Sequence, residues 1–505
     1  MLNKQKTGLF VGLILFFIVL LCPTPESMRP EAMHVLAVAL LMAIWWITQA
    51  IPIPATALLP ILLFPILGVM GGADVTKPYA NHLIYLFLGG FLIAVTIEKW
   101  NLHRRIALHT IKLIGVTPDR IILGFMLASA GLSMWISNTA ATMMMITIGL
   151  AVLKQVVDEI EADPSLNINT RPEHFNFGIA LMLGIAYAAS IGGISTLIGT
   201  PPNAIMVGII ETHFEQSISF LDWMLFALPL SIVMLILTWY YLTRFAFPGE
   251  LEHLPGGRET IQREIVALGK MTHQEKSVLS VFCLVAFLWI TRGFIELEQF
   301  KFITDSTIAM GGAFLLFIIP SDFKSGEFLL DWKTASKIPW DILILFGGGF
   351  ALAQGFTDSG LTYAIAKQLE ILQGSHLILI VIAVISVVII LTEITSNTAT
   401  ASMFLPIVAA LAVAMYVHPY ALMISVALAA SFAFMLPVAT PPNAIAFSSH
   451  YFRIDQMAKT GIWLNLFGII LITLFVMFYL PVIWGIDINT IPEDMIRQAA
   501  VSNQN

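Results

Sequence analysis

The sequence predicts an all-α polytopic membrane protein with about eleven transmembrane helices, two re-entrant helical hairpins and inverted-topology repeats. Composition is the first of three observations behind this prediction. Of the 505 residues, 58% are hydrophobic and only 11% are charged, whereas about 25% of the residues of a soluble domain carry a charge. The mean hydropathy is +0.87 and the net charge is -7. These values exclude a soluble enzyme, a nucleic-acid-binding protein and a single-span receptor.

Long apolar runs are the second observation, because a helix needs roughly 20 apolar residues to cross a membrane. The first run is followed by Pro23-Thr24-Pro25 and by no small-residue cleavage site. We therefore interpret it as a first helix rather than as a signal peptide. The runs expected to form spans are 8–22, 32–51, 54–70, 81–99, 174–210, 223–245, 277–295, 303–320, 340–357, 418–450 and 461–484.

Two further apolar stretches, 120–153 and 377–414, are interrupted by a polar patch. Each is too long for one crossing and too short for two, so we predict that each forms a re-entrant hairpin. With the hairpins counted as no net crossing and the N-terminus inside, 19 of the 25 Lys and Arg residues lie on the inner side. Because cytoplasmic loops carry the excess of positive charge, the N-terminus is predicted to be cytoplasmic and the C-terminus extracytoplasmic.

An internal repeat is the third observation. Residues 86–91, 137–140 and 200–205 recur as 345–350, 396–399 and 440–445, at offsets of 259, 259 and 240. Five net crossings separate the starts of the two copies, so the copies are predicted to be inverted, as in secondary transporters. The expected parts are N-terminal scaffold spans (1–80), a first transport repeat (81–210), scaffold spans and linking loops (211–339), a second transport repeat (340–450), and a last span with a C-terminal tail (451–505).

Ser-Asn-Thr triplets at 137–139 and 396–398 lie in the middle of the two predicted hairpins. Asn and Ser compete for backbone hydrogen bonds and suit a tip where the chain reverses. The helix that follows such a tip directs free N–H groups at it, which attracts anions. A single triplet would fit ordinary contacts between membrane helices, but two copies in register with other motifs favour a binding site.

Thr-Pro-Pro-Asn motifs at 200–203 and 440–443 predict a break in the spans 174–210 and 418–450, because consecutive prolines remove two backbone donors. The break frees carbonyl oxygens, which are the ligands that hard cations prefer. It also creates a new helix N-terminus, which favours an anion.

The polar tips and breaks contain no Lys, Arg or His. Because burying an anion without a counter-charge costs several kcal/mol, bound cations are expected at this site. Glu393 is the only acid within these motifs. A hydrogen-bonded structural role for Glu393 is favoured over a proton relay.

The two triplets, the two breaks and the stretch 430–445 (Ala-Ser-Phe-Ala-Phe-Met-Leu-Pro-Val-Ala-Thr-Pro-Pro-Asn-Ala-Ile) resemble the divalent anion/sodium symporter family. That family includes carriers of dicarboxylates, citrate and sulfate, and the resemblance covers nearly the whole chain. It implies a homodimer in the cell membrane, surrounded by lipid, whose transport domain moves by an elevator mechanism against a scaffold.

The same resemblance implies specific ligands, residue by residue. One sodium ion (Na+) would be bound by Ser133, Ser137, Asn138 and the carbonyl of Gly199, and a second by Thr392, Thr395, Asn397 and the carbonyl of Ala439. The residues implied to contact a dicarboxylate are Asn138, Thr139, Ser396, Asn397 and Thr398, with Thr200, Pro201, Thr440 and Pro441 at the sides.

Several functions stay open at this point. The leading interpretation is sodium-coupled transport of C4 dicarboxylates such as succinate, malate or fumarate. The alternatives with the same fold are a sodium-independent exchanger, for example of 2-oxoglutarate against malate, and a citrate or sulfate carrier. An anion channel is disfavoured by the inverted repeats. A membrane enzyme is disfavoured because the apolar spans show no His cluster, paired carboxylates or nucleophile–base set.

Overall fold

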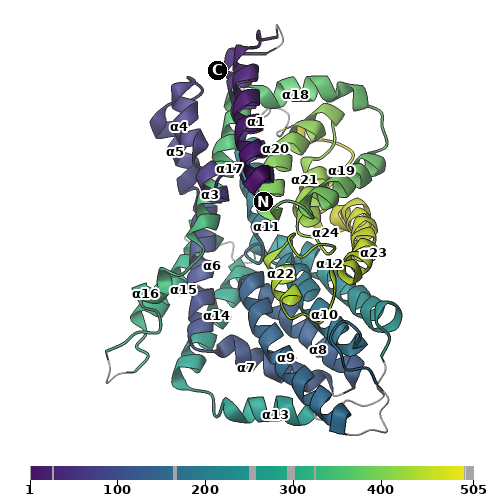
Figure 1. Ribbon diagram of the computed structural model, residues 1–505. Coiled ribbons are helices and arrows are strands. Elements are labelled where there is room, and N and C mark those ends of the chain that lie inside the picture. Colours follow the sequence, from purple (N-terminus) through teal and green to yellow (C-terminus); the bar gives the residue numbers. More distant parts are fainter. Residues whose placement is uncertain are drawn as a thin grey trace.

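The computed structural model describes residues 2–25, 28–115, 117–162, 168–249, 257–292, 302–322, 326–493 and 495. These residues form helices and no β-strand, apart from one isolated bridge between Pro320 and Phe328 (Figure 1). Ten of the described helices are long and apolar enough to cross a membrane, and a bent pair raises the number to 11. The predicted all-α polytopic membrane protein is confirmed. Parts of the expected linking loops (250–256, 293–301 and 323–325) and the last residues of the C-terminal tail lie outside the described residues.

The N-terminal part contains short helices as well as spans. The sequence predicts one span over 54–70, but the structure divides this run between α3 and α4. Pro60 occupies the first turn of α4 and Pro65 lies inside it, and proline removes a backbone donor that a longer helix would need. The helices are α1 Leu2–Leu21, α2 Pro30–Thr48, α3 Ile53–Thr56, α4 Leu59–Ile66, α5 Gly72–Thr76, η1 Lys77–Ala80 and α6 His82–Lys99.

The repeat extends over six helices in each half of the chain. Helices α8 and α19 begin 259 residues apart, α9 and α20 do so as well, and α11 and α22 begin 240 residues apart. The first copy continues from α6 with α7 Leu102–Ile114, α8 Pro118–Ser133, α9 Asn138–Ala162, α10 Asn176–Gly193 and α11 Pro201–Phe214. The second copy is α17 Trp340–Asp358, α18 Leu361–Leu369 with η5 Glu370–Leu372, α19 Leu377–Thr392, α20 Asn397–Met415, α21 Pro419–Ala430 and α22 Pro441–Phe447.

The remaining helices connect or follow the two copies. They are α12 Phe220–Tyr241 with η2 Leu242–Ala246, α13 Gly257–Ala267, α14 His273–Thr291, α15 Asp305–Ile318, α16 Trp332–Ala335, α23 Ile454–Leu474, η6 Phe475–Tyr479 and α24 Leu480–Trp484. In Figure 1, α8 and α9 lie in the lower part of the molecule and α19 and α20 in the upper part, with α11 and α22 between them. The two copies therefore approach each other at their broken helices.

The glycine-rich motifs allow two helices to pack closely against their neighbours. A Cβ added at Gly89 of α6 would lie 2.6 Å from the backbone of Ala309 in α15. A Cβ added at Gly348 of α17 would lie 2.3 Å from the carbonyl oxygen of Ala57. Small residues let membrane helices approach at backbone contact. The motif thus positions α6 and α17, whose other faces border the cavity described below.

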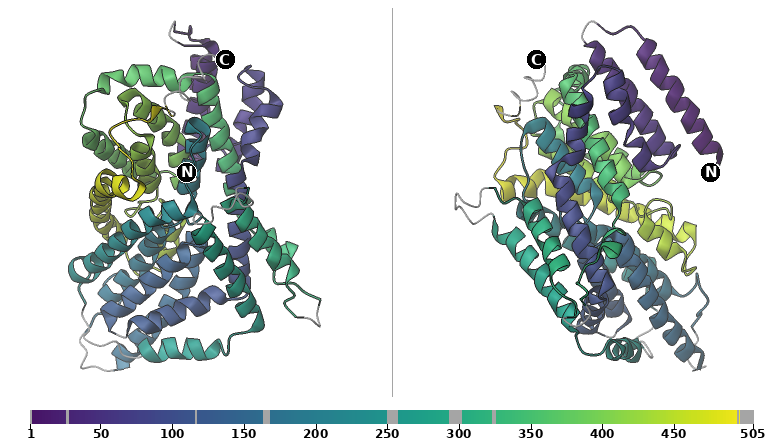
Figure 2. Two further views of the ribbon diagram at one scale, coloured as in Figure 1. Left: turned by 180° about the vertical axis from the view of Figure 1, so that it is seen from behind. Right: turned by 90° about the vertical axis from the view of Figure 1, so that its left-hand side faces the viewer.

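Buried side chains form two clusters. The larger cluster extends over both repeats together with α12, α14 and α23, and the smaller one joins α1 to α5 with α17. The right-hand view of Figure 2 shows α1 and α2 together at one side of the molecule.

Candidate functional site

The Ser-Asn-Thr triplets lie at the turns between α8 and α9 and between α19 and α20. Ser133, the last residue of α8, hydrogen-bonds Asn138 Oδ1, and its Oγ lies 2.7 Å from the carbonyl oxygen of Ala189. In the second turn, Thr392 Oγ1 lies 2.8 Å from Asn397 Oδ1 and 2.7 Å from the carbonyl oxygen of Ala430. Both hydroxyl residues are fully buried. A buried hydroxyl thus connects the first turn to α10 and the second turn to α21, the helices that follow the two hairpins.

The predicted helix breaks are present at both Thr-Pro-Pro-Asn motifs. Helix α10 ends at Gly193 and α11 begins at Pro201, while α21 ends at Ala430 and α22 begins at Pro441. The prolines occupy the first turn of the new helices, where their missing N–H groups cost nothing.

The asparagine of each motif fixes the broken segment that precedes it. Asn203 Nδ2 donates to the carbonyl oxygens of Ile194 at 3.3 Å and Thr196 at 2.8 Å. Asn443 Nδ2 donates to those of Ala433 at 2.9 Å and Leu436 at 3.1 Å. Both asparagines are completely buried. The same side chain therefore determines the loop conformation in both copies.

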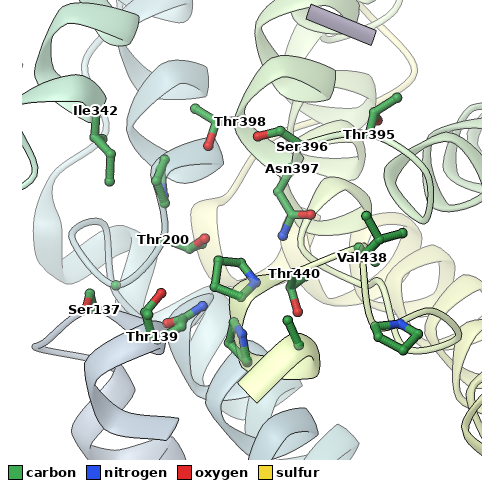
Figure 3. Close-up of a pocket in the computed structure, with 18 of the residues that line it drawn as sticks. Ser137, Thr139, Thr200, Ile342, Thr395, Ser396, Asn397, Thr398, Val438 and Thr440 are labelled. Atoms are coloured by element: carbon green, nitrogen blue, oxygen red, sulfur yellow. The ribbon is translucent and has the colours of Figure 1, made fainter. Parts of the chain in front are cut away.

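A cavity of about 490 Å³ lies between the two turns and the two breaks. Figure 3 shows Ser137 and Thr139 on one side of it and Ser396, Asn397 and Thr398 on the other. Its volume is in the range of small-molecule sites. The residues implied by the resemblance that line it are Ser137, Asn138, Thr139, Gly199, Thr200, Pro201, Thr395, Ser396, Asn397, Thr398, Ala439, Thr440 and Pro441.

Two of the implied ligands, Ser133 and Thr392, do not line the cavity. They lie behind its wall and contact Asn138 and Asn397 instead. The sequence also missed four wall residues that come from outside the turns and breaks: Gln49, Phe87, Phe91 and Ile342. Phe87 and Phe91 belong to the first glycine-rich motif, which is a signal that could have been used, whereas nothing in the sequence marks Gln49 or Ile342.

None of the described residues that line the cavity carries a formal charge. The polar groups are hydroxyls and amides, and helices α9, α11, α20 and α22 all begin at the cavity. Helix N-termini present free N–H groups and a partial positive charge. The cavity can therefore bind an anion only through partial charges, unless cations accompany it.

Oxygen atoms crowd together at the first turn. A Cβ added at Gly199 would lie 2.3 Å from the carbonyl oxygen of Gly193 and 3.0 Å from that of Ser133. A Cβ added at Gly193 would lie 2.7 Å from Asn138 Oδ1. Backbone and amide oxygens thus converge where no side chain intervenes, which is a donor set suited to a hard cation.

Glu393 distinguishes the second turn from the first, where Met134 occupies the corresponding position. Its buried carboxylate accepts hydrogen bonds from the backbone N–H groups of Phe434, Met435 and Leu436 at 2.8 to 3.1 Å. Asn465 Nδ2 of α23 donates to it at 2.7 Å. These contacts join the second turn to the second break and to α23, in agreement with the structural role favoured from the sequence.

An all-helical apolar protein with a polar cavity between two copies of one broken-helix motif has the architecture of a secondary transporter. Residues 3–486 match the family described as the sodium:sulfate symporter transmembrane region. The chain belongs to this family, which confirms the resemblance, and it is a transport protein rather than an enzyme.

Two relatives at higher identity agree with this assignment. The chain is 47% identical over 489 residues to the sodium-dependent dicarboxylate transporter SdcS of Staphylococcus saprophyticus, covering 96% of this chain and 93% of that protein. The protein of the same name from Staphylococcus aureus is 47% identical over 488 residues, with the same coverage.

Two solved structures share the fold at low identity. MtrF of Neisseria gonorrhoeae has a TM-score of 0.54 at 12% identity, over 91% of this chain and 96% of that one. The YdaH transporter of Alcanivorax borkumensis has a TM-score of 0.54 at 12% identity, over 89% of this chain and 98% of that one.

Proposed function

We propose that this chain carries C4 dicarboxylates such as succinate, malate and fumarate across the cytoplasmic membrane together with sodium ions. The observation that carries the proposal is the uncharged cavity built from two copies of the same turn and break. The relatives named sodium-dependent dicarboxylate transporters support the choice of ion and substrate class. A dianion needs positive partners in such a cavity, and sodium ions supply them.

In this proposal the substrate carboxylates are bound by the hydroxyls and amides at the two turns. Asn138 and Thr139 contact one carboxylate, while Ser396, Asn397 and Thr398 contact the other. Thr200, Pro201, Thr440 and Pro441 form the sides. All nine residues line the cavity, and the helices that begin at Asn138 and Asn397 add partial positive charge.

One sodium ion is assigned to each turn. Ser133, Ser137, Asn138 and the carbonyl of Gly199 form the first site, and its counterpart consists of Thr392, Thr395, Asn397 and the carbonyl of Ala439. The crowded oxygen atoms around Gly199 support the first assignment. The buried Thr392 and the hydrogen bond between its hydroxyl and Asn397 support the second.

The proposed movement is an elevator-like displacement of the two repeats (81–210 and 340–450) against the scaffold spans of a homodimer. The hairpins α8–α9 and α19–α20 would be re-entrant, with the N-terminus cytoplasmic and the C-terminus extracytoplasmic. The excess of Lys and Arg on the inner segments supports this orientation.

Succinate uptake into proteoliposomes, with and without an inward sodium gradient, tests the proposed function. Uptake should require sodium, and malate and fumarate should compete. Uptake of labelled 2-oxoglutarate that depends on internal malate and ignores sodium would instead identify an exchanger. Sodium-driven uptake of labelled citrate or sulfate that succinate does not inhibit would identify a carrier of those anions.

A further inference from the structure

Gln49 occupies a wall of the cavity that neither turn nor break supplies. The other wall residues outside the turns and breaks are Phe87 and Phe91 of α6 and Ile342 of α17, all of them apolar. Gln49 follows α2 and is the one member of this group with hydrogen-bond donors in its side chain. It is therefore placed to add a polar contact that neither the turns nor the breaks supply.

The backbone of Gln49 is in the left-handed conformation, with φ 50° and ψ 43°. This conformation is costly for residues with a Cβ, and Gly or Asn is the usual residue at such a helix end. Non-glycine residues in unfavourable backbone conformations cluster at functional sites, and Gln49 keeps a long side chain at the cavity.

Gln49 is exposed and its amide has no hydrogen bond to any of the described residues, so its donors are available to a ligand. The residue also lines a second hollow of about 380 Å³, together with Gln5 and Asp341. Asp341 is exposed, and Ile342 next to it lines the first cavity. Gln49 thus lies where the two spaces meet, and the carboxylate beyond it repels an anion.

We propose that Gln49 is a specificity-determining residue whose side-chain amide donates hydrogen bonds to the substrate carboxylate nearest the second hollow. This inference rests on the proposed function, because it requires a dianion in the cavity. Because the cavity has no charged side chains, each hydrogen-bond donor to a carboxylate contributes strongly, typically tenfold or more in affinity. A monocarboxylate bound at the other turn would not reach Gln49, so the residue favours dianions, which occupy both turns at once.

Gln49→Gly is the most direct test, because glycine removes the side chain and suits the left-handed backbone. In sodium-driven uptake assays the KM for succinate should rise about tenfold, while the maximal rate and the sodium concentration for half-saturation stay within twofold of the parental values. Gln49→Asn keeps an amide on a shorter side chain, and its KM for succinate should lie between those of the parental protein and Gln49→Gly. Gln5→Ala is the matched control, since Gln5 lines the second hollow but not the cavity.

Competition by a monocarboxylate gives a second readout. The parental protein should prefer succinate to butyrate by a ratio that falls about tenfold in Gln49→Gly. An unchanged KM, or a combined loss of maximal rate and sodium affinity, would overturn the inference, the latter by assigning Gln49 a structural role. Failure of the proposed function looks different: the parental protein itself would then take up no succinate with sodium, and the inference would fall with it.

Discussion

At the scale of single residues, the site depends on two asparagines that have two proposed partners each. Asn138 and Asn397 line the cavity and also accept hydrogen bonds from the buried hydroxyls of Ser133 and Thr392. An amide can offer its oxygen to a cation and its N–H groups to a carboxylate at the same time. In the proposed mechanism, the Asn138 and Asn397 side chains therefore link the sodium ions to the substrate.

Asn138→Ala and Asn397→Ala should each abolish sodium-driven succinate uptake, because each removes a contact to both ligands. Asn176→Ala is the matched control, since Asn176 lies outside the cavity and hydrogen-bonds the carbonyl oxygen of Pro248. Uptake and size-exclusion profiles should be measured for all three variants. Near-parental uptake with normal sodium dependence in either cavity variant would refute the shared contact for that turn.

Ser133→Ala and Thr392→Ala should raise the sodium concentration for half-maximal uptake by about tenfold, the effect of losing one or two polar contacts. Succinate affinity should recover at high sodium. Ser129→Ala is the control, because Ser129 is buried one turn earlier in α8 and bonds only the carbonyl oxygen of Phe125 among the described residues. Sodium curves that match the parental curve would remove both residues from the cation sites.

The sequence predicted most of the cavity because the motifs are local and occur twice. Thirteen implied residues, from Ser137 to Pro441, line the cavity, since each belongs to a turn or a break that a short stretch of sequence determines. Gln49 and Ile342 could not be predicted in this way. They reach the cavity from α2 and α17, and only tertiary packing brings those helices there.

At the scale of the elements, the proposed first cation site depends on how closely α10 approaches the first turn. Gly193 ends α10 beside Asn138. Since Ser133 holds Asn138 in place, the amide cannot move away without losing a hydrogen bond. The close approach is therefore a requirement of the proposed cation site and not only of helix packing.

Gly193→Ala should displace the Asn138 amide, because the added Cβ would lie 2.7 Å from Oδ1. Uptake should fall at least tenfold with little loss of thermal stability. Gly131→Ala is the control: Gly131 lies in α8, and a Cβ added there meets no atom within 4 Å. Transport rates and unfolding temperatures should be compared in detergent and in liposomes. Parental rates in Gly193→Ala would show that Asn138 can be displaced without effect.

The element prediction was accurate for long apolar runs and incomplete elsewhere. Three prolines, Pro54, Pro60 and Pro65, interrupt the run 54–70, and hydropathy alone does not register them. The amphipathic helices α7 and α18 were missed because they mix exposed charged residues such as Lys112 with buried ones such as Ile111. They correspond in the two repeats, so a search for repeated helical periodicity would have found them.

At the scale of the whole molecule, the proposed mechanism couples ion and substrate through one uncharged cavity. Sodium should increase succinate affinity, and succinate should increase sodium affinity by the same factor, because coupling between binding sites is reciprocal. Binding of succinate to the purified protein should be measured across a sodium titration, with choline as the replacement ion. Affinity that stays constant across the titration would exclude sodium coupling and favour an exchanger.

Glu393 also has a consequence for how voltage acts on the carrier. All its observed partners are hydrogen-bond donors, as an ionised carboxylate requires. In the proposed movement this negative charge travels with the second hairpin through the membrane field, which is worth up to about 2.3 kcal/mol per charge per 100 mV. An inside-negative potential pulls the charge outward. If the second hairpin moves as proposed, this one charge contributes a bias of the empty carrier toward the outside, before sodium or substrate has bound.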